Sequence, residues 1–173
     1  MFQDGSTMED VYFERQSLMR CAVHTLNNIL QQHAYTASDL DDLAYELTPF
    51  SILASNPHKS FFGVGNYDVN VLTKALEKSG LNIQWWPKSS SVETLPYETV
   101  LGFIVNVKMN NSLLDLVYDR RHWFSIRKLN GVWYNLDSLM SRPCTLTEGQ
   151  LHAFLSKCID VDDGHIFLIS AKQ

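Results

Sequence analysis

HWFSIRKLNGVWYNLD, residues 122–137, places two runs of aromatic and branched side chains on either side of Asn130-Gly131. Such runs favour β-strands, and Asn-Gly between them is the strongest short-range signal of a hairpin with a two-residue turn. The sequence therefore predicts two antiparallel strands in which Leu129 pairs with Val132.

The predicted register brings His122 and Asp137 together. His122 faces Leu139, and Asp137 lies two residues before Leu139 on the same face. Diagonal neighbours on one face are roughly 7 to 8 Å apart at the backbone, a gap that an imidazole and a carboxylate can bridge. A four-residue loop keeps this arrangement, whereas an odd loop or a bulge would put the two groups on opposite faces. The hairpin therefore predicts a pair between His122 and Asp137.

Cys21 lies where a helical pattern begins. Apolar side chains recur at helical spacing after it, at Ala22, Leu26, Ile29 and Leu30. Ser17 is a suitable N-cap, so we expect Cys21 near the first turn of this helix and near the protein surface. The free amides and the positive end of the helix dipole favour a thiolate there, and a nearby imidazolium favours it further.

Taken singly, these three residues have ordinary structural explanations. A cysteine in a helix is more often a small buried hydrophobe, and a lone histidine or aspartate on a strand is usually structural. Their combination is different, because Cys21, His122 and Asp137 supply a thiol nucleophile, its base and a group that orients the base. The pattern indicates nucleophilic catalysis.

Three segments resemble the Josephin family of cysteine deubiquitinases: ERQSLMRCAVHTLNNILQ at residues 14–31, the His122-Trp123 step, and WYNLDS at residues 133–138. The resemblance extends from about residue 11 to about residue 169. Within the family it is closest to the short members that consist of little besides this domain, which share stretches such as residues 56–60 and 65–71.

The resemblance implies a role for each site residue. Cys21 is the nucleophile, His122 the general base and acid, and Asp137 the residue that orients the imidazole. Some family members have Asn at the last position, and either side chain can accept a hydrogen bond from the imidazole. Gln16 matches the family's oxyanion-stabilising glutamine, whose amide acts with the Cys21 backbone N–H. The alternative for Gln16 is a solvated loop amide.

The remaining pattern predicts an α+β fold. Helices are expected after the capping sequences at residues 36–39 and 147–150 and after Asp68, with Gly80 ending the helix that Asp68 begins. Strands are expected at residues 81–86, 101–107 and 165–169 beside the hairpin. Runs of helices followed by runs of strands indicate a largely antiparallel sheet. The resemblance implies the papain-like architecture, in which the helical part packs on that sheet.

Length and cysteine content fit a single intracellular domain. The 173 residues can bury roughly 70% of the surface of the unfolded chain, and we expect a short tail at residues 1–10 followed by one catalytic domain at residues 11–173. Three cysteines without CxxC spacing indicate neither a disulfide framework nor a zinc site, and they favour a reducing compartment. We expect no metal or organic cofactor.

Charge and hydropathy exclude other classes of protein. A net charge of −5 and the lack of a basic stripe argue against nucleic-acid binding, although an acidic surface can still meet a basic partner such as ubiquitin. The first ten residues lack the features of a signal peptide, and no apolar run approaches the length of a membrane span. We expect a cytoplasmic, monomeric protein, and peripheral association with a membrane stays open.

Other motifs carry less weight. His24 lies one helical turn from Cys21, but a base so close in sequence would lack the in-line geometry, so a structural role is favoured. Trp123 is expected to pack over the site, while Trp85 and Trp86 are equally consistent with the core and with a binding surface. Phe61 and Phe62, in a long loop, are further candidate contacts with a partner.

The sequence thus predicts a ubiquitin-directed thiol isopeptidase whose partners are ubiquitin, ubiquitinated proteins and polyubiquitin. Two alternatives stay open: a catalytically weak ubiquitin-binding module, and a Cys-His-Asp acyltransferase, which uses the same chemical groups in the same chain order.

Overall fold

The computed structural model describes residues 11–17, 20–47, 67–109 and 120–172. The expected tail at residues 1–10, the stretch at residues 56–60 and the pair Phe61 and Phe62 lie outside the described residues, as do residues 65 and 66. The helices are α1 (Cys21–Leu30), α2 (Ala37–Leu47), α3 (Val69–Lys78), the short 3-10 helix η2 (Val92–Thr94) and α5 (Glu148–Asp160). The strands are β1 (Leu81–Trp86), β2 (Gly102–Lys108), β3 (Arg121–Leu129), β4 (Val132–Asn135), β5 (Cys144–Leu146) and β6 (His165–Ala171).

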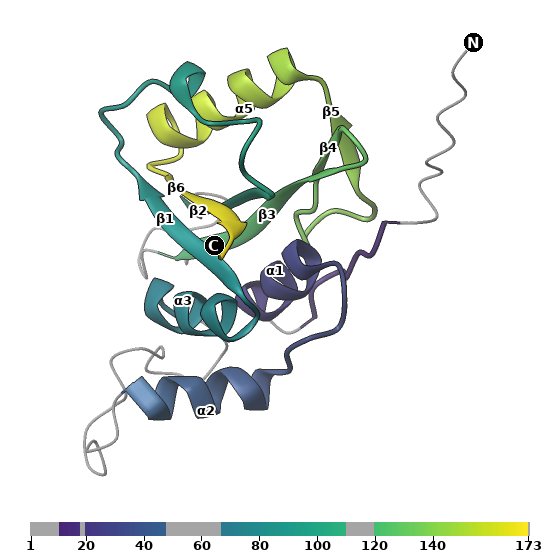
Figure 1. The fold of residues 1–173 in the computed structure, drawn as a ribbon, viewed down its shortest axis with the longest axis vertical. Helices are drawn as coiled ribbons and strands as arrows, with labels where there is room; N and C mark the ends of the chain where they lie inside the picture. The colour runs from purple at the N-terminus through teal and green to yellow at the C-terminus, as the bar shows by residue number, and fades with distance from the viewer. Residues whose placement is uncertain (1–10, 18–19, 48–66, 110–119, 173) are drawn as a thin grey trace.

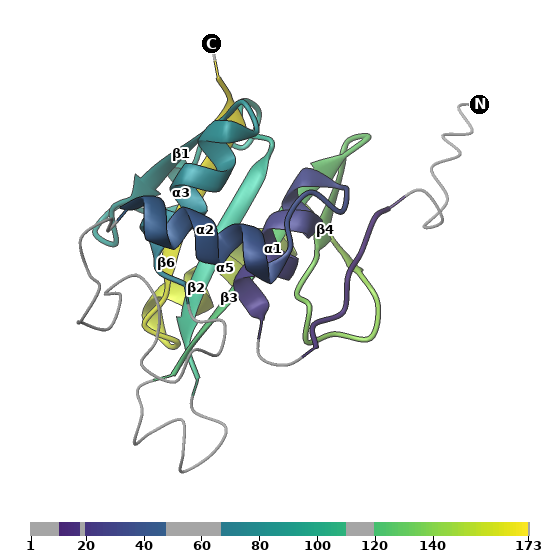
Figure 2. The same cartoon turned by 90° about the horizontal axis from the view of Figure 1, so that it is seen from below.

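The six strands of the described residues join one sheet in the order β1-β6-β2-β3-β4-β5, and every neighbouring pair is antiparallel. Figure 1 shows α1, α2 and α3 on one side of this sheet and α5 on the other. The turned view of Figure 2 shows α1 and α2 lying across the strands and confirms this layering. The predicted α+β fold with a helical part packed on an antiparallel sheet is therefore confirmed.

The sheet separates two hydrophobic cores. On β2, Ile104 faces the core that α1, α2 and α3 cover, while its neighbours Phe103 and Val105 face the core that α5 covers. On β6, Phe167 and Ile169 belong to the first of these cores. Because both faces of these central strands are buried, their sequences read as continuous apolar runs.

The predicted hairpin forms with the predicted register. Leu129 pairs with Val132, and Ile126 pairs with Asn135. Asn130 and Gly131 have φ values of 48° and 81°, as a type I′ turn requires at both central positions. The backbone N–H of Leu136 donates to the carbonyl of Ser125 at 2.9 Å, which carries the same register one step toward His122 and Asp137.

The predicted helix caps are present. Thr147 and Gln150 form a reciprocal capping box at α5, and Asp68 accepts hydrogen bonds from the first amides of α3. Asp39 accepts from the backbone N–H of Thr36 at 2.7 Å at the start of α2. Gly80 follows the end of α3 with φ of 75°, a left-handed conformation that glycine adopts without steric cost.

The edge strand β5 and the helix η2 were not expected from the sequence, because three-residue elements carry too little periodic pattern. Among the described helices, none combines the length and apolar character that crossing a bilayer requires.

Candidate active site

Cys21 is the first residue of α1, and the N-cap position is Arg20, whose side chain makes no capping hydrogen bond. The expected N-cap at Ser17 is therefore wrong. The backbone N–H of Ser17 instead donates to Nε2 of His24 at 3.4 Å. Because α1 begins at Cys21, this residue lies closer to the unpaired amides at the helix start than the sequence indicated.

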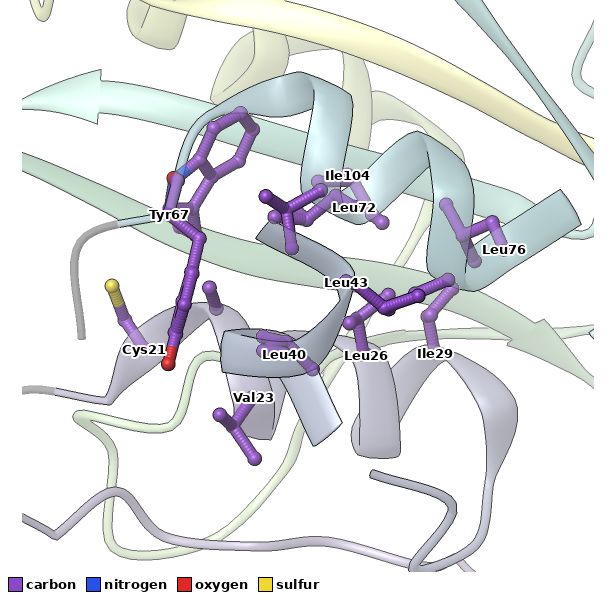
Figure 3. Packing of buried hydrophobic residues seen from close by; sticks show 14 of the residues in the cluster. Cys21, Val23, Leu26, Ile29, Leu40, Leu43, Tyr67, Leu72, Leu76 and Ile104 are labelled. Atoms are coloured by element: carbon purple, nitrogen blue, oxygen red, sulfur yellow. The ribbon is translucent and has the colours of Figure 1, made fainter. Parts of the chain in front are cut away.

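The expectation of a thiol near the surface is also wrong. Cys21 is only 4% exposed and belongs to the core that α1, α2 and α3 share. Figure 3 shows it at the start of α1 close to Tyr67, with Leu26 and Ile29 further along the same helix.

His122 links the helix to the hairpin. Its imidazole is 4% exposed, and Nε2 lies 2.7 Å from Oδ1 of Asp137, a distance typical of a charge-assisted hydrogen bond. The thiol of Cys21 also lies close enough to the imidazole to raise the pKa of His122. Because Asp137 occupies Nε2, the nitrogen left for Cys21 is Nδ1. The ring also stacks against Phe124, which limits its rotation.

The environment of His122 favours the imidazolium. Burial by itself lowers the pKa of His122, but the hydrogen bonds to Asp137 and Cys21 and their negative charges outweigh it and raise the pKa to about 9. The imidazolium is the form of histidine that can give a proton to a leaving group.

Asp137 is held in place by its own backbone surroundings. Oδ1 accepts a second hydrogen bond, from the backbone N–H of Leu139 at 2.9 Å, and the N–H of Asp137 donates to Oδ1 of Asn135 at 3.0 Å. The side chain is 21% exposed. These bonds fix the carboxylate in the direction that the imidazole needs.

Gln16 reaches the same loop from the segment that precedes α1. Its backbone N–H donates to the carbonyl of Ser138 at 2.9 Å, and the hydroxyl of Ser138 donates to Oε1 of Gln16 at 3.2 Å. Since Ser138 directly follows Asp137, the structure brings all four predicted site residues together at one end of the hairpin and of α1.

Asn28 on α1 holds the segment before α1 and the loop after β4 against this helix. Its side-chain amide donates to the carbonyl of Leu136 at 3.0 Å and to that of Glu14 at 3.2 Å, and its Oδ1 accepts from the N–H of Glu14 at 2.6 Å. Asn28 is fully buried. The sequence alone gives Asn28 no role, although Asn28 lies within residues 14–31, which resemble the family. Its partner Leu136 is too remote in the chain for the bond to be predicted.

His24 has the structural role that the sequence favoured. Its Nδ1 lies 2.7 Å from Oε2 of Glu14, and the same carboxylate contacts Nδ1 of His33 at 2.8 Å and the amide of Asn27 at 3.1 Å. Tyr12 donates a further hydrogen bond to Glu14. We call these five residues the Glu14 cluster. It attaches the segment bearing Gln16 to α1.

The Glu14 cluster predicts a specific pH dependence of stability. Burial by itself raises the pKa of Glu14. The hydrogen bonds from Tyr12, His33, Asn27 and His24 outweigh burial and lower the pKa to about 2. A lowered folded-state pKa stabilises the protein above the unfolded pKa and ceases to do so as the pH falls through the folded one. We expect Glu14→Gln to lower the free energy of unfolding by about 1 to 3 kcal/mol at pH 7.

This difference between the two proteins should shrink between about pH 4.5 and pH 2, the range that separates the ordinary and lowered pKa values of Glu14. Urea denaturation at several pH values measures it. Glu98→Gln is the matched control, because the Glu98 side chain is 80% exposed and its pair with Lys128 contributes little. A difference that is independent of pH would mean that the Glu14 charge does not carry the effect.

The tryptophans divide as the sequence allowed. Trp123 is buried, its indole N–H donates to the carbonyl of Tyr67 at 3.0 Å, and both residues belong to the core that also contains Cys21. Trp86 packs against the core that α5 covers, whereas Trp85 is 50% exposed and contacts His165 and Phe167.

Among the residues that the structure describes, no group of three or more His, Cys, Asp or Glu side chains is arranged to hold a metal ion.

The Josephin family model matches residues 16–170, a range that contains all four predicted site residues. Josephin-2 from Homo sapiens is 41% identical over 166 residues, which cover 94% of this chain and 87% of that protein. A Josephin-like protein from Drosophila melanogaster is 39% identical over 164 residues, covering 92% of this chain and 73% of that protein. Ataxin-3 from Rattus norvegicus is 26% identical over 167 residues, covering 87% of this chain and 43% of that protein.

Proposed function

Because the chain belongs to the Josephin family, we propose that it is a deubiquitinating cysteine protease acting through Cys21, His122 and Asp137. The α+β fold is the papain-like fold of that family. The observation that carries the proposal is the position of His122, which is hydrogen-bonded to Asp137 and whose pKa is raised by both Asp137 and Cys21.

The reaction begins with the thiolate of Cys21. It attacks the carbonyl carbon of the C-terminal glycine of ubiquitin, a C–S bond forms, and the carbonyl electron pair moves to oxygen. The amide of Gln16 and the backbone N–H of Cys21 donate to this oxyanion. When the intermediate collapses, the C–N bond breaks and His122 gives its proton to the leaving amine.

Water completes the cycle. The now neutral His122 takes a proton from a water molecule, whose oxygen attacks the thioester carbon. Collapse of the second intermediate breaks the C–S bond and releases the C-terminal carboxylic acid of ubiquitin, which loses its proton to solvent. Cys21 and His122 return to the thiolate and the imidazolium, so no oxidant, metal or other co-reactant is consumed.

The substrate follows from the burial of the nucleophile. Cys21 is 4% exposed, so a bulky side chain beside the scissile carbonyl would meet the walls of the site. The Gly-Gly end of ubiquitin is an extended segment without side chains and suits such a site. The proposed partners are therefore ubiquitin, ubiquitinated proteins and polyubiquitin. We also propose that the enzyme is a cytoplasmic monomer.

Ubiquitin carrying a C-terminal electrophile tests nucleophile and substrate class together. We expect a single adduct, located at Cys21 by mass spectrometry of the digested protein. A probe with the tail changed from Gly-Gly to Ala-Ala should label Cys21 at least about tenfold more slowly, because each added methyl must fit beside the buried thiol. Equal labelling by both probes would contradict the assigned substrate.

The two alternatives give different results. A binding module forms the adduct but does not hydrolyse ubiquitin conjugates, and an acyltransferase prefers a small acyl thioester as donor. Turnover of diubiquitin with no turnover of acyl thioesters supports the protease.

A further inference from the structure

We propose that Ser138 is a positioning residue that fixes the orientation of the Gln16 amide and thereby directs its N–H donors to the oxyanion. The inference rests on the proposed function, since it concerns the same catalytic step. It adds a residue that neither the sequence motif nor the triad assigns.

Two hydrogen bonds join Ser138 to Gln16. The carbonyl of Ser138 accepts from the backbone N–H of Gln16 at 2.9 Å, and the hydroxyl of Ser138 donates to Oε1 of Gln16 at 3.2 Å. Both the backbone and the side chain of Gln16 are therefore held by one residue. A glutamine side chain has three rotatable bonds, and this second contact selects among its rotamers.

The two ends of the Gln16 amide differ in what they can do at the site. A glutamine amide presents an acceptor at Oε1 and two donors at Nε2, and only the donors can stabilise a negative oxygen. The hydroxyl of Ser138 occupies Oε1. With the acceptor engaged, the end of the amide that is left to face the substrate is Nε2. An amide rotated by half a turn would present Oε1, which would repel the oxyanion.

Ser138 is buried and lies beside the other site residues. It is 1% exposed, so water does not compete for its hydroxyl, and a buried polar group of this kind is normally hydrogen-bonded. It also directly follows Asp137 in the chain. One short loop thus orients the imidazole through Asp137 and the amide through Ser138.

Kinetics of Ser138→Ala with a fluorogenic ubiquitin amide test the inference. Loss of one oxyanion donor costs about 10² to 10³-fold in kcat, so we expect that loss for Gln16→Ala. Ser138→Ala leaves the donor present but free to rotate, and we expect kcat to fall by roughly tenfold with little change in KM. In the Gln16→Ala background, Ser138→Ala should cause no further loss, because the group on which it acts is already absent.

Ser125→Ala is the matched control. Ser125 is also a fully buried serine near the site, and among the described residues its hydroxyl has no hydrogen-bond partner. Its removal should leave kcat and KM unchanged. Thermal denaturation of all variants shows that each is folded before the rates are compared.

The pH profile separates this role from a disturbance of the neighbouring Asp137. If Ser138→Ala acted by moving Asp137, the alkaline limb of kcat/KM, which follows His122, would shift. The inference expects a lower plateau with an unshifted limb. A shifted limb, or a full additional loss in the Gln16→Ala background, would overturn the positioning role while leaving the protease activity standing. A fully active Gln16→Ala would overturn the oxyanion role of Gln16 and the Ser138 inference together, whereas labelling of Cys21 by the ubiquitin probe tests the proposed function on its own.

Discussion

Cys21→Ala is expected to reduce hydrolysis of ubiquitin conjugates by about 10⁶-fold, to the background rate, because loss of a nucleophile leaves no covalent route. Binding of ubiquitin should persist, since the thiol forms only a small part of the contact between the enzyme and ubiquitin. The cost in stability should be about 1 kcal/mol, because Cys21 is buried and alanine leaves a small void in place of the sulfur. Steady-state kinetics, a ubiquitin-binding titration and urea denaturation measure the three quantities.

Cys158→Ala is the matched control for this variant. Cys158 is 2% exposed on α5, and burial together with the nearby Asp162 raises the pKa of its thiol to about 12. The thiol therefore stays protonated at neutral pH and should not react. We expect a similar small loss of stability with full activity. Loss of activity in Cys158→Ala, or residual turnover in Cys21→Ala, would contradict the assignment of the nucleophile.

The hairpin shows what the sequence can predict. Its register depends on neighbouring residues alone, because Asn130 and Gly131 adopt the positive φ values of the tight turn and the turn fixes the pairing of Leu129 with Val132. That local geometry is sufficient to bring His122 and Asp137 within hydrogen-bond distance. The helix caps at Asp68 and Thr147 are predictable for the same reason, since each bond spans only a few residues.

The start of α1 and the burial of Cys21 could not be predicted in this way. Ser17 has the right side chain for an N-cap, but its backbone bonds His24, and the helix begins only at Cys21. Whether a thiol at a helix start is exposed depends on what covers it, and here Tyr67 belongs to the same buried cluster. Such contacts arise from the packing of distant segments and leave no periodic signal.

The bonds that support the site are invisible to sequence reasoning for the same physical cause. Ser138 and Gln16 are 122 residues apart, and Asn28 and Leu136 are 108 residues apart. A single serine or asparagine could bond water, backbone or another side chain with equal ease. Only the folded arrangement of α1, the preceding segment and the hairpin selects the partner.

The second large effect is expected at Asp137. Asp137→Ala should lower kcat by roughly 10² to 10⁴-fold, because the imidazole then loses the bond that fixes its orientation and supports its charge. Asp137→Asn should retain much more activity, since the amide oxygen can still accept from Nε2 of His122. The comparison separates orientation, which both Asp and Asn supply, from charge, which only Asp supplies.

The pH profile makes this comparison quantitative. The reactive form needs the imidazolium, so kcat/KM should fall on the alkaline side as His122 loses its proton near pH 9. Removing the Asp137 charge leaves the effect of burial, which lowers the pKa of His122, less opposed. The alkaline limb should therefore move to lower pH in Asp137→Asn and in Asp137→Ala alike. Asp162→Asn, near Cys158 rather than His122, is the charge control and should leave the limb in place. Equal losses of kcat in the Asn and Ala variants, or an alkaline limb that does not move, would remove Asp137 from the role of orienting and charging His122.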